Sequence, residues 1–212
     1  MNNAIDNELK LRDYLNSKII KKLHIGCGSN LLEGWLNADY NVDSSDVFNL
    51  DAAKIFPINS DAFDIIFSEH MIEHINYYQG LSMLNECRRV LKPGGRIRIT
   101  TPDLGFLIGL YTENKSKLQL DYIEWASSNF IQNKIFTDTM IINNFVRDWG
   151  HLFIYDFKTI KYSLEMVGFI NVEPFLLNKS NFSELRDLEN EKRMPDGFLQ
   201  LESFTVEAQK PF

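Results

Sequence analysis

Apolar positions along the 212-residue chain follow two spacings, one typical of amphipathic helices and one typical of buried strands. Residues 8–20 repeat their apolar side chains at roughly helical intervals, which predicts a helix at the start of the chain. Short apolar runs in "KKLHI", "GWLNAD" and "FDIIFSEH" then predict three strands. The third run is apolar almost throughout, as expected of a parallel strand that is buried on both faces, and a helix is predicted around "MIEHI" after it.

The alternation continues in the second half of the chain and is interrupted once. Helical periodicity over residues 77–91 stops at "KPGG", and "RIRITTP" then has the pattern of a strand. Residues 104–150 are aromatic-rich and helical in character. A further helix is predicted to end at Gly168, and "INVEPFLL" and "ESFTVEA" predict two closing strands around the polar residues 178–200. Strands that alternate with helices through short connections predict an α/β fold with a largely parallel sheet.

The composition narrows the class of protein. With 44% hydrophobic and 24% charged residues, the chain has the balance of a soluble globular protein, and its length predicts a single domain over 1–212. A net charge of -7 disfavours a nucleic-acid partner, and no apolar run approaches the roughly 20 residues of a membrane span. The N-terminus lacks a signal-peptide pattern, and Cys27 stands between two glycines, a poor place for a disulfide with Cys87. We therefore expect a cytoplasmic protein that acts on a small molecule.

The stretch "FSEHMIEHI" contains His70, Glu73 and His74 in the H-x-x-E-H spacing of inverted zinc metalloproteases. In those enzymes two histidines one helical turn apart hold zinc, and the glutamate activates water. A zinc site also needs a third ligand, which the pattern does not identify. A zinc hydrolase is therefore a remote alternative, and its weight depends on what surrounds these nine residues.

A glycine turn upstream points to a nucleotide. "HIGCGSN" contains Gly26 and Gly28 but has Leu31 where a dinucleotide fingerprint would have its third glycine. Such glycines let a ligand touch the backbone, although a tight turn without a ligand is the simpler explanation of two glycines alone. Asp39 lies at the end of the next predicted strand, where it is placed to accept hydrogen bonds from a ribose diol. The missing third glycine disfavours a nicotinamide cofactor.

Several stretches together give the chain a family resemblance: "LHIGCGSN", Asp39, "LDAAKIFP", "FDIIFSEHMIEHI", "ECRRVLKPGGRIRITTPD" and "GHLFIYDFKTIKYSLEMVGF". Over most of its length the chain resembles a class I S-adenosylmethionine (SAM)-dependent methyltransferase of the compact bacterial type. The resemblance implies a Rossmann-like, doubly wound sheet of seven strands, mostly parallel with a reversed last strand, and a helical substrate cover over 104–150. It also implies SAM as cofactor and S-adenosylhomocysteine as product. In this family "EHI" commonly follows the fourth strand, so we expect the H-x-x-E-H to be a coincidence of spacing and no metal to be bound.

The resemblance assigns cofactor contacts to the ends of the first, second and fourth strands. Gly26 and Gly28 approach the methionine part, Asp39 binds the ribose, and the residues after the second and third strands contact the adenine. The full expected set is His24, Ile25, Gly26, Cys27, Gly28, Asp39, Tyr40, Asp51, Ala52, Ser68 and Glu69. A helix N-cap is the alternative for Asp51.

His24 is a departure from the family pattern, which usually has an acid here to help place the cofactor's ammonium group. A neutral imidazole can accept a hydrogen bond there, whereas an imidazolium would repel the cofactor. His24 therefore favours the alternative of a non-catalytic protein of the same fold that only binds SAM or its product.

The acceptor side is predicted from residues that follow the strands. Methyl transfer needs the acceptor atom held in line, and a hydroxyl acceptor also benefits from a base. His70, His151 and Asp103 are the candidate catalytic residues, with an N-cap as the alternative for Asp103. The aromatic residues of 104–150 are expected to form the core of the cover. Relatives of this type often accompany genes for surface polysaccharides, so the expected acceptor is a sugar or sugar-nucleotide hydroxyl.

Overall fold

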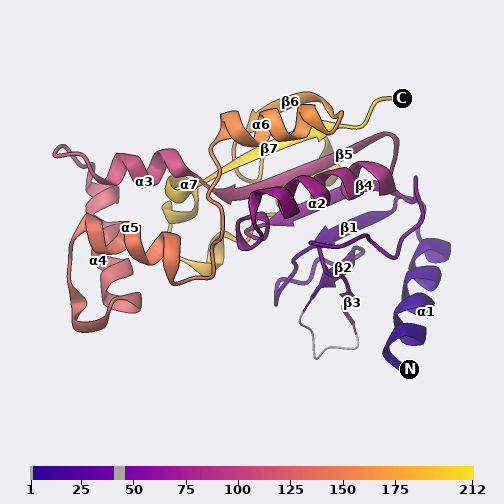
Figure 1. Ribbon diagram of the computed structural model, residues 1–212, viewed down its shortest axis with the longest axis horizontal. Helices are drawn as coiled ribbons and strands as arrows, with labels where there is room; N and C mark the ends of the chain where they lie inside the picture. Colours follow the sequence, from indigo (N-terminus) through magenta and orange to yellow (C-terminus); the bar gives the residue numbers. More distant parts are fainter. Residues whose placement is uncertain (1, 41–45) are drawn as a thin grey trace.

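A seven-stranded sheet forms the centre of the computed structural model, which describes the backbone of residues 2–40 and 46–212 and the side chains from Asp6 onward within these ranges. The strand order is β3-β2-β1-β4-β5-β7-β6 (Figure 1). The first five strands pair in parallel, and β7 is inserted antiparallel between β5 and β6. The strands are β1 (Lys22–Ile25), β2 (Leu36–Asp39), β3 (Phe48–Asn49), β4 (Phe63–Glu69), β5 (Leu91–Pro102), β6 (Ile170–Phe175) and β7 (Ser203–Gln209). This confirms the expected mostly parallel sheet with a reversed last strand.

Helices lie beside the sheet and beyond one end of it. Figure 1 shows α2 and α6 together on one face, and α3, α4 and α5 gathered past the carboxyl end of β5. The helices are α1 (Asn2–Ser17), α2 (Tyr77–Val90), α3 (Leu104–Leu110), α4 (Lys117–Phe130), α5 (Asp138–Arg147), α6 (Phe157–Met166) and α7 (Phe198–Glu202). Four short 3-10 turns are η1 (Ile72–His74), η2 (Gln132–Lys134), η3 (Ser183–Leu185) and η4 (Glu191–Arg193). None of the described helices is both long and apolar enough to span a membrane.

The helix expected around "MIEHI" forms, but it is short. Only the single turn η1 forms there, because Ile75 is already extended and Asn76 begins α2 as its N-cap. The Asn76 side chain accepts from the Gln79 amide while the Gln79 side chain accepts from the Asn76 amide, which is a capping box. The cap fixes where α2 starts and leaves room for one turn between it and β4.

Each of the two parts of the molecule has its own hydrophobic core. The larger core lies between the sheet and the helices α2 and α6, and includes Ile66, Leu84 and Leu164, each fully buried. The smaller core lies among α3, α4 and α5, where Tyr122 and Phe145 are almost completely buried against Phe198 of α7. The Tyr122 hydroxyl donates to the Glu202 carboxylate, so α7 connects this cover to the strand that follows it, β7.

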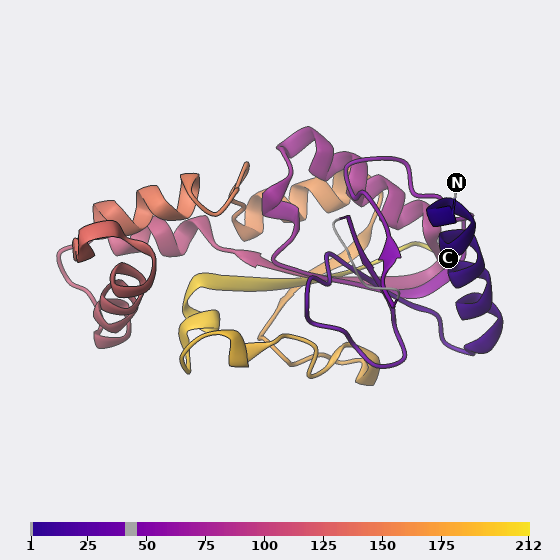
Figure 2. The same ribbon diagram turned by 90° about the horizontal axis from the view of Figure 1, so that it is seen from below.

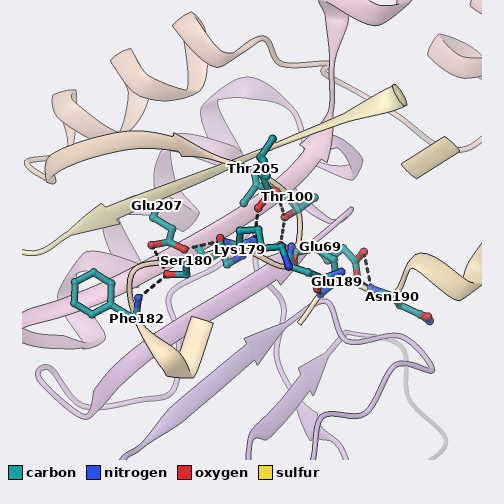
Figure 3. A network of polar contacts seen from close by, with 12 residues as sticks. Glu69, Thr100, Lys179, Ser180, Phe182, Glu189, Asn190, Thr205 and Glu207 are labelled. Carbon is teal, nitrogen blue, oxygen red and sulfur yellow. Dashed lines mark hydrogen bonds and ion pairs between the residues drawn. The ribbon is translucent and has the colours of Figure 1, made fainter. Parts of the chain in front are cut away.

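The opposite face of the sheet is covered by the stretch from 176 to 197, which Figure 2 shows on the side away from α2 and α6. A buried arginine of β5 anchors it. Arg98 pairs with Glu189 at 2.7 Å and with Glu207 at 2.6 Å, and its Nη1 donates to the Lys179 carbonyl at 2.9 Å. Thr100 also donates to Glu189, as part of the network drawn in Figure 3. These bonds hold residues 176–193 against the sheet and bring η4 to the strand ends.

Candidate active site

The turn after β1 depends on two glycines in the left-handed region. Gly26 has φ +71°, its amide donates to the Ala38 carbonyl at 2.8 Å, and a Cβ there would lie 2.2 Å from the Met71 Cγ. Gly28 has φ +49°, and a Cβ there would meet no atom within 4 Å. The Gly28 amide donates to the Asp39 Oδ2 at 2.8 Å. A side chain is therefore excluded at Gly26 by packing, while Gly28 leaves its backbone open to a ligand.

The cavity above this turn, called here the cofactor cavity, has a volume of about 400 Å³. It is lined by Ile25, Gly26, Gly28, Asp39, Tyr40, Leu50, Asp51, Ala52, His70, Met71, His74 and Ile75. Tyr40, which lines this cavity, is 62% exposed, so its ring is available to a planar group. Asp51 accepts from the Ala53 amide at 3.0 Å and pairs with Lys54. It therefore stabilises its own turn and also lines the cofactor cavity.

A smaller cavity of about 240 Å³, called here the methionine-side cavity, adjoins the same turn. Cys27, buried with a thiol pKa raised to about 11, lies on its wall beside His24, Glu69 and Arg193. Burial lowers the pKa of His24 to about 4, and its Nδ1 lies 3.2 Å from the Asn37 Oδ1. The imidazole is therefore neutral near pH 7, and the repulsion that a charged ring would exert on the cofactor does not arise.

Glu69 places an acid in this cavity, on the strand next to the one where the family pattern has it. Its carboxylate accepts from the Asn190 amide at 3.2 and 3.3 Å, and burial raises its pKa while the charge of Arg193 opposes the rise. Figure 3 shows Asn190 beside Glu69, next to Glu189, which pairs with Arg98; Arg193 follows three residues later in the same stretch.

A third cavity of about 290 Å³, called here the acceptor cavity, lies between the cover and the strand ends. Its walls come from the exit of β4, from the cover, from the residues around η4 and from the end of α7. The lining residues are His70, Glu73, His74, Trp125, Phe130, Phe145, Trp149, His151, Arg193, Met194 and Glu202. His70 lines all three cavities. It has φ +47°, its Nε2 lies 2.7 Å from the Ser203 Oγ, and burial lowers its pKa well below the usual range.

Glu73, His74 and His151 bring their ligand atoms within 4.8 Å of one another in this acceptor cavity. Glu73 is fully buried, which raises its pKa to about 8, and its Oε2 accepts from the Thr101 hydroxyl at 3.1 Å. Burial also lowers the pKa of His151 to about 4, so the ring is neutral near pH 7. The His151 Nδ1 lies 2.6 Å from the Phe145 carbonyl, which can only accept. The Nε2 of His151 therefore carries the lone pair.

Two predicted site residues lie away from these cavities. Asp103 caps α3, where its Oδ1 accepts from the Gly105 amide at 2.8 Å, and it lines none of the three. Its carboxylate therefore has the N-cap role that the sequence offered as the alternative to a catalytic one. Ser68 is 1% exposed, lines none of them either, and its hydroxyl has no hydrogen-bond partner among the described residues.

Sequence reasoning also missed parts of the acceptor cavity. Trp125 and Phe130, expected as core of the cover, line this cavity, whereas Tyr122 is core as expected. Arg193 was not identified, because it lies in a polar stretch whose position depends on the Arg98 network rather than on any local pattern.

Comparisons with known proteins agree with this architecture. Residues 23–99 match the family model described as a methyltransferase domain. A SAM-dependent methyltransferase from Archaeoglobus fulgidus is similar in structure, with 17% identity and a TM-score of 0.53, over 97% of this chain and 94% of that one. No curated protein matches the sequence at a significant level.

Two further solved structures have the same fold. One is a protein of Bordetella parapertussis described as a possible exported protein, with 12% identity and a TM-score of 0.54, over 97% of this chain and 67% of that one. The other is a chain from the complex between the Haloferax volcanii Trm112 methyltransferase activator and a methyltransferase, with 13% identity and a TM-score of 0.51, over 96% and 89%.

The glycine turn and its acid on β2 lie within residues 23–99, the part of the chain that matches a methyltransferase domain. The strand order around them is that of the fold expected for a class I SAM-dependent methyltransferase.

Proposed function

We propose that the protein moves the methyl group of SAM to an oxygen of a small molecule that binds between the cover and the strand ends. The observation that supports this most is the shared wall of two cavities: His70 and His74 line both the cofactor cavity and the acceptor cavity. A methyl group can be transferred only if donor and acceptor are held in contact and in line. SAM in the cofactor cavity and an acceptor in the acceptor cavity would lie next to each other across this wall, as methyl transfer requires.

Within the cofactor cavity we assign the roles that the strand ends suggest. Asp39 binds the ribose hydroxyls, while Tyr40, Asp51 and Ala52 surround the adenine. In the methionine-side cavity, Glu69 supplies the negative charge for the ammonium group, and Arg193 is placed to bind the carboxylate. Glu69 thereby takes the role that an acid at the position of His24 has elsewhere in the family.

The reaction itself is a displacement at the methyl carbon. The acceptor oxygen forms a bond to carbon as the carbon–sulfur bond breaks, sulfur keeps the electron pair, and SAM becomes the neutral thioether S-adenosylhomocysteine. The hydroxyl proton must also leave. His151 lines the acceptor cavity as a neutral imidazole whose Nε2 offers a lone pair there, whereas the His70 Nε2 lies 2.7 Å from the Ser203 Oγ and is engaged with it.

A sugar or sugar nucleotide is the acceptor that we propose. Trp125, Phe130 and Trp149 supply flat apolar walls that fit the apolar face of a sugar ring. The opposite wall holds carboxylates and imidazoles, which suit ring hydroxyls. We also propose that residues 1–212 act as one domain, because both parts of the molecule line this cavity.

We further propose a cytoplasmic location and no nucleic-acid partner. The location is supported by Cys27 and Cys87, which are both buried free thiols. A net charge of -7 supports the absence of a nucleic-acid partner.

The test is formation of S-adenosylhomocysteine from SAM in the presence of a panel of sugars and sugar nucleotides. With hydroxyl-bearing members of the panel we expect more S-adenosylhomocysteine than in the acceptor-free background. With Asp39→Ala we expect none when the SAM concentration is below the raised dissociation constant of that variant. Calorimetry on the same samples reports SAM binding separately. A protein that does not bind SAM would overturn the proposal, and turnover only with non-hydroxyl acceptors would overturn the oxygen assignment.

A further inference from the structure

We infer that Glu73, His74 and His151 bind a divalent first-row metal ion in the acceptor cavity, and that the ion holds the oxygen to be methylated. The second half of this inference rests on the proposed function, and the first half does not. The sequence led us to expect no metal, because "EHI" commonly follows the fourth strand in the family that the chain resembles. The structure, however, groups Glu73 and His74 with His151.

The spacing of the donor atoms suits one ion. The ligand atoms of the three side chains all lie within 4.8 Å of one another. Nitrogen and oxygen ligands about 2.0–2.2 Å from an ion are separated by at most about 4.4 Å. Small rotations of the side chains, by less than about 1 Å at the donor atoms, are enough to close the site. His74 is more exposed than Glu73 and His151, and its ring already lies against that of His151, at 5.0 Å between the ring centroids.

An unsatisfied carboxylate oxygen points independently to a ligand. Glu73 is 0% exposed, lines the acceptor cavity, and its Oε1 has no hydrogen-bond partner among the described residues. The His70 Nδ1 lies 3.3 Å from this oxygen without forming a hydrogen bond. A buried carboxylate oxygen left in this state is costly, so an unfilled partner position is the simplest explanation.

The surroundings also hold the ligands in place. The Thr101 hydroxyl bonds the Glu73 Oε2, so the other oxygen is the one presented to the cavity. The His151 Nδ1 donates to the Phe145 carbonyl, which leaves its Nε2 to coordinate, the arrangement common to metal-binding histidines. The next residue is also tied to the site, since the Leu152 amide donates to the Glu73 carbonyl at 2.7 Å. The cover is thus joined to the exit of β4 where the three ligands meet.

The donor set indicates which ions fit. Two imidazoles and one carboxylate favour Zn²⁺, Mn²⁺ or Fe²⁺ over Mg²⁺, which prefers oxygen ligands only. The nearby cation Arg193 lines the same cavity, and its Nη2 lies 4.0 Å from the Glu202 Oε1, so a carboxylate offsets its charge. Three protein ligands leave coordination positions open for an acceptor oxygen.

The ion would act as a Lewis acid with no change in its oxidation state. Coordination lowers the pKa of the acceptor hydroxyl, so His151 acts here as a ligand and not as the base, and the proton passes to water at the mouth of the cavity. The oxygen then forms its bond to the methyl carbon as the carbon–sulfur bond breaks. His74 lines both the acceptor cavity and the cofactor cavity, so an ion bound to it lies beside the place where the sulfonium is expected.

The experiment measures the metal alone. Full-length protein is stripped with a chelator and titrated with Mn²⁺, with bound ion followed by electron paramagnetic resonance and calorimetry. We expect one Mn²⁺ per chain, displaced by Zn²⁺. Glu73→Gln, His74→Gln and His151→Asn should each weaken binding at least tenfold. The matched controls Glu165→Gln and Asp148→Asn, which lie outside the site, should bind as the wild type does.

The results separate this inference from the proposed function. SAM binding is measured on the same stripped samples and should persist without metal. If SAM binds but Mn²⁺ and Zn²⁺ do not bind at one per chain, the metal site is overturned and the methyltransferase assignment stands. Equal metal affinity in all three variants would also overturn it. His74 is exposed, so His74→Gln decides the matter if a buried variant does not fold.

Discussion

The cofactor side and the acceptor side of this protein are built in different ways. On the cofactor side, neighbouring parallel strands end together and present their next residues to one cavity, as with Gly28 after β1 and Asp39 at the end of β2. On the acceptor side, the cavity wall is assembled from residues as distant in the chain as His74, Trp125 and Arg193. The first arrangement follows from the sheet alone, whereas the second requires the cover and the anchored stretch 176–193 to be in place.

This difference implies that the two sides respond differently to mutation. A mutation at the glycine turn affects the backbone hydrogen bonds of that turn and of the strands beside it. A change in the cover acts through a core that contacts the sheet mainly through α7 and the segment after His151. The predictions below test this separation, starting with the network that both sides share.

The largest effect is expected from Arg98→Met. It leaves Glu189 and Glu207 buried without the cation that pairs with both, and loss of one partner of a buried pair costs about 3–5 kcal/mol. The free energy of unfolding, measured with urea, should fall by about that amount. The control Arg96→Met, a partly exposed residue whose guanidinium lies 3.5 Å from the Phe182 ring, should cost about 1 kcal/mol or less. Equal losses in the two variants would contradict the role of Arg98 as the anchor.

The second prediction concerns His24 and acid. Its pKa is 6.5 in an unfolded chain and about 4 when folded, so below pH 6.5 the unfolded chain binds a proton that the folded protein does not. Above pH 6.5, His24 is neutral in both states and does not reduce the free energy of unfolding. As the pH falls from 6.5 to about 4, protonation favours the unfolded chain, and the free energy of unfolding decreases by about 3 kcal/mol in total.

The variant His24→Leu should lose less stability than the wild type over this range, by up to that amount. Asn37 keeps its two bonds to the Leu32 backbone, so the replacement leaves no new unpaired amide. Urea unfolding at several pH values without SAM tests this. Parallel curves for the two proteins would show that His24 does not titrate as its burial requires.

A third prediction separates the two sides directly through Asp39→Ala. Removing hydrogen bonds to a charged carboxylate costs about 1.5–3 kcal/mol each, so affinity for SAM should fall at least about tenfold. The thermal midpoint without ligand should remain close to that of the wild type, although the Gly28 amide also loses its partner. Calorimetry with SAM and a thermal melt provide the two measurements. Unchanged affinity would remove Asp39 from the ribose site.

The smallest effect on the cofactor is expected from Trp149→Ala. Trp149 lines the acceptor cavity and is absent from the linings of the cofactor and methionine-side cavities. SAM affinity should therefore change by about twofold or less, while the affinity for an identified acceptor falls by at least about fivefold. A large loss of SAM affinity would mean that the cover and the cofactor side are coupled more closely than their separate cores indicate.

How far the sequence could predict this structure follows the same division. The largely parallel sheet and the roles of residues such as Gly26 and Asp39 could be predicted, because each depends on a short local pattern and on the rule that parallel strands end at one edge. The role of Asp103 could not be decided from the sequence, because an acid after a strand suits both a cleft and a helix cap.

Other features had no local signal to find. The position of Arg193 depends on buried ion pairs between β5 and residues almost a hundred positions later, such as Arg98 with Glu189. The grouping of His151 with Glu73 depends on how the cover returns to the sheet, which the spacing within H-x-x-E-H does not contain. Trp125 has the same helical periodicity as the core residue Tyr122, yet it lines the acceptor cavity, because it lies at the edge of that core.

The anchoring of residues 176–193 by Arg98 has a consequence for inheritance. A lineage that loses the arginine alone retains two buried acids without a counter-charge, and one that loses both acids retains a buried cation. Selection therefore acts on Arg98, Glu189 and Glu207 as one heritable unit, and close descendants should keep all three or replace them together. The aromatic residues of the cover that line the acceptor cavity, such as Trp125 and Trp149, take no part in these ion pairs, so new acceptor preferences can evolve there while the bound cofactor keeps its surroundings.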